Sequence, residues 1–100
     1  MHRLAKVEGG VIMSQPINMP ALSDTMSNGR LVKWTKKPGD TIRKGDVIAE
    51  VETDKAVMEV EAYHNGYLSG PLLAEGTEAP VGRVIGYIAD SPNEVQTELR

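Results

Sequence analysis

The chain has 100 residues, a formal net charge of −3 and 11 Lys and Arg residues scattered along it, so it offers no basic patch for nucleic acid. It contains no apolar run long enough to cross a membrane, and it contains no cysteine, which excludes disulfides, thiolate metal sites and a cysteine nucleophile. One small domain of this size has little room for an enclosed catalytic pocket. Two histidines are too few for a multi-histidine metal site.

In chain order, residues 1–14 lack the apolar segment of a secretory signal, and we predict that they form a flexible N-terminal extension. Residues 15–90 form the predicted domain. Residues 91–100 have no strand pattern and are predicted to begin a linker or a flexible tail.

Within residues 15–90, Gly and Pro recur so often that almost no window can hold a helix of ordinary length. Short β-branched or aliphatic runs lie between them, at residues 31–32, 47–51, 57–62 and 84–89. Many short strands separated by turn residues are typical of an all-β sandwich or barrel.

An internal repeat organises these runs. An offset of 37 residues superimposes Asn28-Gly29 on Asn65-Gly66, Leu31 on Leu68, Gly39 on Gly76, Gly45 on Gly82, Val47-Ile48 on Val84-Ile85 and Val51 on Ile88. Glycine matches with aliphatic matches between them indicate two copies of one β unit. Each copy has an apolar face to bury, so we predict that the halves pack as a pseudo-twofold sandwich. Most of the glycines are predicted to lie in turns, and those of the two Asn-Gly pairs are expected to adopt positive φ.

The segment between the two halves, residues 47–62, alternates on both sides of Asp54-Lys55 and predicts a hairpin. The expected pairs are Thr53 with Ala56, Glu52 with Val57, Val51 with Met58, Glu50 with Glu59, Ala49 with Val60 and Val47 with Ala62. The last two of these pairs and Val51/Met58 then form an apolar face, while Ile48, Glu50, Glu52, Val57, Glu59 and Glu61 form a mostly acidic one. A slip of one residue would expose the apolar set, so the register is well specified.

Lys55 is therefore expected at the tip of the hairpin, in solvent, at the seam between the repeats. Asp-Lys supplies no residue that favours positive φ, so we predict a wider type I turn flanked by Thr53 and Ala56, stiffer than a glycine turn. By charge pattern alone Lys55 is an ordinary solvated turn lysine. Its position at the seam and its flanking sequence favour a modification site.

The sequence Glu52-Thr53-Asp54-Lys55-Ala56, with residues 57–62 after it, resembles the lipoylation site of lipoyl domains from dihydrolipoyl acyltransferases. The similarity extends over MPALS at 19–23, GRLVKW at 29–34, the turn sequences at 37–40 and 44–46, and PVG at 80–82. MPALS favours the pyruvate or acetoin branch. Tyr63-His64 and residues 68–72 depart from the family pattern and leave the complex served undecided.

The resemblance implies a flattened barrel of two four-stranded antiparallel sheets, with lipoic acid in amide linkage to Lys55. It implies that Asp54 and Ala56, and more weakly Glu52 and Gly39, support recognition by a lipoate-protein ligase or lipoyl transferase. It also implies that one exposed loop helps a thiamine-diphosphate-dependent 2-oxo-acid decarboxylase recognise its domain. That loop comprises Leu22, Ser23, Asp24, Thr25, Met26, Ser27 and Asn28.

By the same resemblance, the chain is a swinging-arm carrier of acyl groups and reducing equivalents. It would serve the decarboxylase, the acyltransferase core and dihydrolipoyl dehydrogenase, in the bacterial cytoplasm or the mitochondrial matrix. The domain is expected to be monomeric, to bind neither nucleic acid nor membrane, and to be a non-catalytic part of an acyltransferase subunit.

Three alternatives stay open. A biotinyl carrier domain also exposes a lysine, but usually between methionines, whereas Asp54 and Ala56 flank Lys55 here. The glycine-cleavage carrier is lipoylated but usually longer, and an unmodified β-sandwich interaction domain would carry nothing. An enzyme is disfavoured, because no serine lies in a nucleophile elbow and no acid pair is evident. His64 is predicted to be a solvated turn residue, and Trp34 and Met58 are predicted to be core residues.

Overall fold

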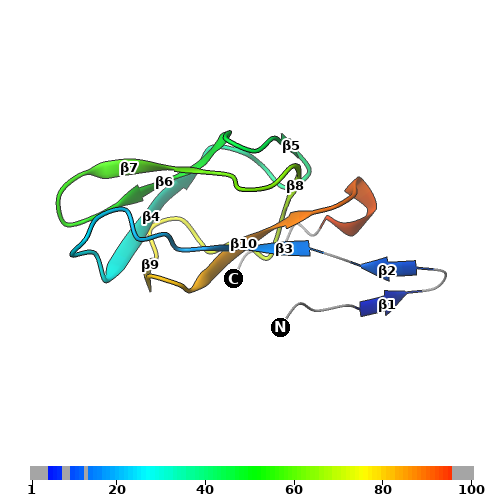
Figure 1. Cartoon of the computed structure of the whole chain (residues 1–100), viewed down its shortest axis with the longest axis horizontal. Helices are drawn as coiled ribbons and strands as arrows, with labels where there is room; N and C mark the ends of the chain where they lie inside the picture. Colours follow the sequence, from blue (N-terminus) through cyan, green and yellow to red (C-terminus); the bar gives the residue numbers. More distant parts are fainter. Residues whose placement is uncertain (1–4, 8–9, 13, 96–100) are drawn as a thin grey trace.

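The computed structural model describes residues 5–7, 10–12 and 14–95. Two four-stranded antiparallel sheets form the body, with strand orders β3-β10-β8-β5 and β7-β6-β4-β9 (Figure 1). The elements are β1 (Ala5–Val7), β2 (Gly10–Ile12), β3 (Ser14–Asn18), β4 (Asn28–Trp34), β5 (Thr41–Ile42), β6 (Val47–Glu52), β7 (Val57–Glu61), β8 (Gly66–Ser69), β9 (Glu78–Pro80), β10 (Val84–Ala89) and the short 3-10 helix η1 (Pro92–Glu94). The predicted all-β class with two four-stranded sheets is confirmed. Over the described ranges, no helix is long and apolar enough to cross a membrane.

The two sheets repeat one another at the predicted offset. Shifting the chain by 37 residues carries β4 onto β8, β5 onto β9 and β6 onto β10, and β3 then occupies the place of β7 in the strand order. The turn glycines match in backbone conformation as well: Gly39 and Gly76 have φ of 94° and 89°, and Gly45 and Gly82 have φ of 95° and 94°. Each sheet takes an edge strand from the other half, because β5 pairs with β8 and β9 pairs with β4. The halves therefore depend on each other to complete their sheets.

The core lies between the sheets and is built from matching positions of the repeat. Leu31 and Leu68 are fully buried, and Ile48 and Ile85 are buried beside them. A fully buried aliphatic side chain contributes about 1.5–3 kcal/mol relative to an exposed one, so these pairs supply much of the stability of the sandwich.

The two Asn-Gly pairs do not form the tight turns that the sequence predicts. Gly29 lies inside β4 and has no positive φ, while Gly66 begins β8 with φ of 155°. Both glycines are instead sites of close packing. A Cβ atom on Gly29 would lie 2.7 Å from Val51 Cγ1, and one on Gly66 would lie 2.6 Å from Ile88 Cγ2 and against the carbonyl oxygen of Ala89.

The β6–β7 hairpin has most of the predicted register. Glu52, Val51, Glu50 and Ala49 pair with Val57, Met58, Glu59 and Val60, as expected. The prediction fails at Val47, which pairs with Glu61 because the register shifts between Val47 and Ala49. This bulge turns Ile48 into the core and leaves Val47 half-buried, the reverse of the predicted faces. Met58, predicted as a core residue, is 37% exposed. It lies on β7, an edge strand that pairs with β6 along one edge only.

The ends of the body lie side by side. Ser14, at the start of β3, pairs with Ala89, at the end of β10. Within the predicted extension at 1–14, the structure describes the separate hairpin β1–β2, whereas residues 1–4, 8–9 and 13 lie outside the described residues. Of the predicted tail at 91–100, only residues 91–95 are described, and they include η1.

Candidate functional site

The β6–β7 turn projects at one end of the sandwich, at the end of the molecule remote from β1–β2 (Figure 1). Asp54, Lys55 and Ala56 are all exposed there. Among the residues that the structure describes, none forms a hydrogen bond or ion pair with the Lys55 ammonium. The lysine is therefore held in place only through its backbone.

Thr53 closes this turn. Its backbone N–H donates to the Ala56 carbonyl at 2.8 Å, and its hydroxyl donates to the same oxygen at 3.0 Å. The hydroxyl oxygen also accepts the N–H groups of Lys55 and Ala56, each at 3.1 Å. No non-glycine residue among those described has positive φ. The absence of positive φ agrees with the predicted type I turn flanked by Thr53 and Ala56, which stays a prediction, whereas the hydrogen-bonding role of Thr53 was not foreseen from the sequence.

Two of the carboxylates near the turn are paired across β4 and β6. Arg30 forms an ion pair with Glu52, in which Nε donates to Oε1 at 2.9 Å. That hydrogen bond and the charge of Glu52 raise the pKa of Arg30. Lys33 Nζ lies 3.9 Å from a Glu50 oxygen. Asp54, by contrast, is exposed beside Lys55 at the tip of the turn.

The loop between β3 and β4 ends beside the turn, because β4 begins at Asn28 and Arg30 pairs with Glu52 next to the tip. Of the seven predicted recognition residues, Asn28 belongs to β4 and Met26 is buried, packed near the Gly29 backbone. Leu22 is partly buried against the core, and its backbone N–H points to the Met26 sulfur at 3.2 Å. The exposed members of the loop are Asp24, Thr25, Ser27 and Asn28.

Gly39, a predicted recognition residue, does not lie near the β6–β7 turn. It lies in the loop after β4, beyond the end of that strand remote from Asn28, and its N–H donates to the Leu68 carbonyl at 2.7 Å. Trp34, predicted as a core residue, is partly buried against the core, and its indole N–H donates to the Leu73 carbonyl at 3.0 Å. His64 is exposed, as predicted. Among the described residues, no cluster of three His, Cys, Asp or Glu could hold a metal ion.

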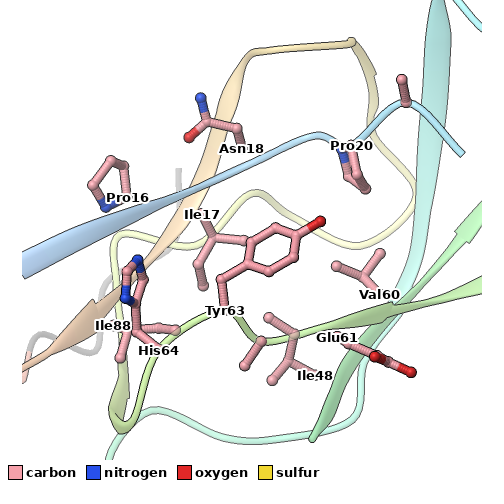
Figure 2. A pocket seen from close by; sticks show the side chains of 12 residues that line it. Pro16, Ile17, Asn18, Pro20, Ile48, Val60, Glu61, Tyr63, His64 and Ile88 are labelled. Carbon is pink, nitrogen blue, oxygen red and sulfur yellow. The ribbon is translucent and has the colours of Figure 1, made fainter. Parts of the chain in front are cut away.

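A hollow of about 300 Å³ opens on the flank of the sandwich, between edge strands β3 and β7. Its floor is apolar and includes Ile17, Ile48 and Val60. Figure 2 shows the ring of Tyr63 lying across it, with the hydroxyl directed towards Pro20. This aromatic side chain is 74% exposed, so the departure from the family pattern at residue 63 lies on the surface.

Comparison with known proteins agrees with this geometry. The model of the biotin/lipoyl family, described as "Biotin-requiring enzyme", matches residues 15–88. A solution structure of the lipoyl domain of the 2-oxoglutarate dehydrogenase complex from Azotobacter vinelandii aligns with a TM-score of 0.58 and 30% identity, covering 75% of this chain and 98% of that one. The chain belongs to the lipoyl-domain family.

The similarity to curated proteins points the same way. This lipoyl domain is 46% identical over 79 residues to component 5 of the chloroplastic pyruvate dehydrogenase complex acetyltransferase of Arabidopsis thaliana, covering 79% of this chain and 17% of that protein. It is 53% identical over 76 residues to the mitochondrial acetyltransferase component of Saccharomyces cerevisiae, covering 74% of this chain and 16% of that protein. The chain thus spans about a sixth of the length of these relatives.

Lipoyl domains are carriers, and they bear lipoic acid covalently on a lysine. The turn residues fit this group on a simple physical test. Lys55 is exposed and its ammonium has no partner among the described residues, so converting it to an amide would break no ion pair or hydrogen bond. Neither flanking residue, Asp54 or Ala56, is buried, so nothing at the tip would have to move for an attached chain to extend into solvent.

Proposed function

We propose that Lys55 is the lipoylated residue and that this domain is the carrier part of the acetyltransferase subunit of a pyruvate dehydrogenase complex. The observation that carries the proposal is the presentation of the Lys55 amine, which has no partner among the described residues, on a glycine-free turn at the end of the sandwich. When bound, the lipoyl group supplies a disulfide whose reduction is coupled to acyl transfer.

The contribution of the chain itself is position. The β6–β7 pairing fixes the base of the turn at Glu52 and Val57, and the hydrogen bonds of Thr53 fix its tip. A long arm on Lys55 can then reach several active sites while the domain stays attached to its complex, which raises the effective concentration of the arm at each site. The domain needs no catalytic group for this role.

The proposed recognition residues follow from the same geometry. Asp54 and Ala56 flank the lysine and are exposed, so a ligase or lipoyl transferase would contact them first. Glu52 lies at the base of the turn and is bound to Arg30, so we propose that it acts by fixing the hairpin. The exposed part of the β3–β4 loop, led by Asp24 and Thr25, is the proposed contact for a thiamine-dependent decarboxylase.

The pyruvate complex is proposed from the named relatives, which are acetyltransferase components of that complex. The remaining proposed partners are the acyltransferase core and dihydrolipoyl dehydrogenase. The relatives include bacterial, mitochondrial and chloroplastic proteins. The comparisons are therefore compatible with the proposed bacterial cytoplasm or mitochondrial matrix and also with a chloroplast.

Intact mass spectrometry after incubation with a lipoate-protein ligase, lipoate and ATP tests the site. We expect an increase of about 188 Da, the mass of one lipoyl group in amide linkage, against about 226 Da for biotin after incubation with a biotin ligase. Lys55→Arg should abolish the increase. The matched control is Lys44→Arg, which alters another exposed turn lysine and should leave the increase unchanged.

Addition of mass to the Lys55→Arg variant would place the modification elsewhere and refute the site. Biotinylation of the wild-type chain in place of lipoylation would support the biotinyl carrier. Absence of either addition on the folded wild-type chain would support the unmodified interaction domain.

A further inference from the structure

The turn that presents Lys55 depends on the side chain of Thr53, which the sequence does not mark as a site residue. Thr53 follows the last residue of β6, and beyond it only Asp54 and Lys55 separate it from Ala56. Tight two-residue hairpin turns normally rely on Gly or Asn at positive φ, and this turn has neither. Some other interaction must therefore hold it.

The Thr53 hydroxyl provides that interaction. Two consecutive backbone N–H groups, those of Lys55 and Ala56, converge on its oxygen at 3.1 Å each, and its hydrogen points to the Ala56 carbonyl at 3.0 Å. A Ser or Thr hydroxyl that bonds backbone two and three residues ahead offers the chain a local alternative to ladder hydrogen bonds. Here it ties down the peptide groups on either side of the Lys55 α-carbon.

This matters because the amine of Lys55 has no other anchor among the described residues. The direction of its side chain is set by the backbone of the turn, and Thr53 fixes that backbone. In the ligase reaction the amine nitrogen loses a proton and bonds to the carboxyl carbon of an activated lipoyl anhydride, while the bond from that carbon to the phosphate oxygen breaks and the phosphate leaves with the electron pair. Such an attack requires the reacting atoms to be aligned at roughly 3–3.5 Å.

We propose that Thr53 is a positioning residue for lipoylation, whose hydroxyl orders the turn and presents Lys55 to the ligase. The inference rests on the proposed modification of Lys55 and adds a residue that acts through the backbone and not by contact with the ligase. It follows that the hydroxyl matters and the branched methyl group does not.

The test compares Thr53→Val, which keeps the shape and loses the hydroxyl, with Thr53→Ser, which keeps the hydroxyl. Thr53→Val loses all three hydrogen bonds of the hydroxyl, and the loss of the two that hold the Lys55 and Ala56 amides should lower kcat/KM for lipoylation by about tenfold, roughly a factor of three for each of these two bonds. Because the ligase must then select a less populated turn conformation, the change should fall mainly on KM. Thr53→Ser should restore most of the wild-type value.

Amide hydrogen exchange gives a readout that does not depend on the ligase. In Thr53→Val the amides of Lys55 and Ala56 should exchange faster, while those of the buried strand positions keep their wild-type rates. The matched control is Thr35→Val, because the Thr35 hydroxyl donates to the Val47 carbonyl at 2.9 Å, at the other end of β6. That variant should leave kcat/KM and the exchange of the turn amides unchanged.

A wild-type chain that is not modified at Lys55 would overturn the proposed function and this inference together. A modified wild type whose kcat/KM is unaffected by Thr53→Val would overturn the inference alone. Equal losses in Thr53→Val and Thr53→Ser would also overturn it, because they would assign the effect to the methyl group or to packing.

Discussion

The two repeat-related glycines Gly29 and Gly66 should tolerate a methyl group very differently. At Gly29, a new Cβ would meet the ends of three side chains: Met26 Cε and Val51 Cγ1, each at 2.7 Å, and Met19 Sδ at 2.9 Å. The two methionine side chains are flexible and can move aside, and the Val51 methyl group must also give way, so Gly29→Ala should cost about 1–3 kcal/mol by overpacking.

At Gly66 the new Cβ would meet the backbone oxygen of Ala89, which cannot move without disturbing the β8–β10 pairing. The φ of 155° adds backbone strain for any residue with a side chain. Together these effects should cost Gly66→Ala about 3–5 kcal/mol, a large share of the roughly 5–15 kcal/mol that stabilises a typical domain.

Urea unfolding followed by fluorescence of Trp34, the single tryptophan, measures both variants. The control is Gly39→Ala, which has φ of 94° and no atom within 4 Å of the new Cβ, and so isolates the backbone cost at about 1–3 kcal/mol. An unchanged m value would show that the unfolding transition is comparable. If Gly66→Ala were no more destabilising than Gly29→Ala, the packing argument would be wrong.

Two further substitutions probe the core and the surface. Leu68→Ala removes a fully buried side chain and should lower the free energy of unfolding by about 2–5 kcal/mol in the same urea assay, and a loss below about 1 kcal/mol would contradict the assigned core. Glu52→Gln breaks an exposed ion pair, so it should lower the unfolding midpoint only slightly, and the difference should vanish in high salt. Since Glu52 raises the pKa of Arg30, raising the pH removes the contribution of the pair only when the pH passes through that raised value, and the midpoint difference should be equal at neutral and mildly alkaline pH.

The division of the sandwich into two repeated halves was predictable because its determinants are local and repeated. Turn glycines such as Gly45 and Gly82 mark the same backbone conformation in each half, and the offset between them is visible in the sequence. The register of the β6–β7 hairpin near its tip was predictable for a similar reason, since only one alternation buries Val51 and Ala49.

The bulge in β6 was not predictable from alternation. Val47 and Ile48 are both apolar, so the sequence does not say which of them faces the core. Hydrogen bonds at the open end of the hairpin accompany the bulge: the Ala62 N–H donates to the Asp46 carbonyl at 2.8 Å, and the Gly45 N–H donates to the Ala62 carbonyl at 2.9 Å. These contacts draw the chain out of regular pairing and turn Ile48 inward.

The position of the candidate site was predictable, but the hydrogen bonds that hold the turn were not. The tip residue Lys55 follows from the pairing pattern, whereas the role of Thr53 depends on a hydroxyl that meets three backbone groups in space. The partial burial of the predicted recognition loop was also not predicted from the sequence. It arises because Met26 turns inward and packs near Gly29.

The pairing of Ser14 with Ala89 has a mechanical consequence. Any polypeptide joined to the sandwich through either residue is attached at the end remote from Lys55. A force applied through such a segment therefore acts on β3 and β10 and not directly on the turn. A six-residue strand such as β6 measures about 20 Å, and the rigid body extends the radius swept by the amine by that distance.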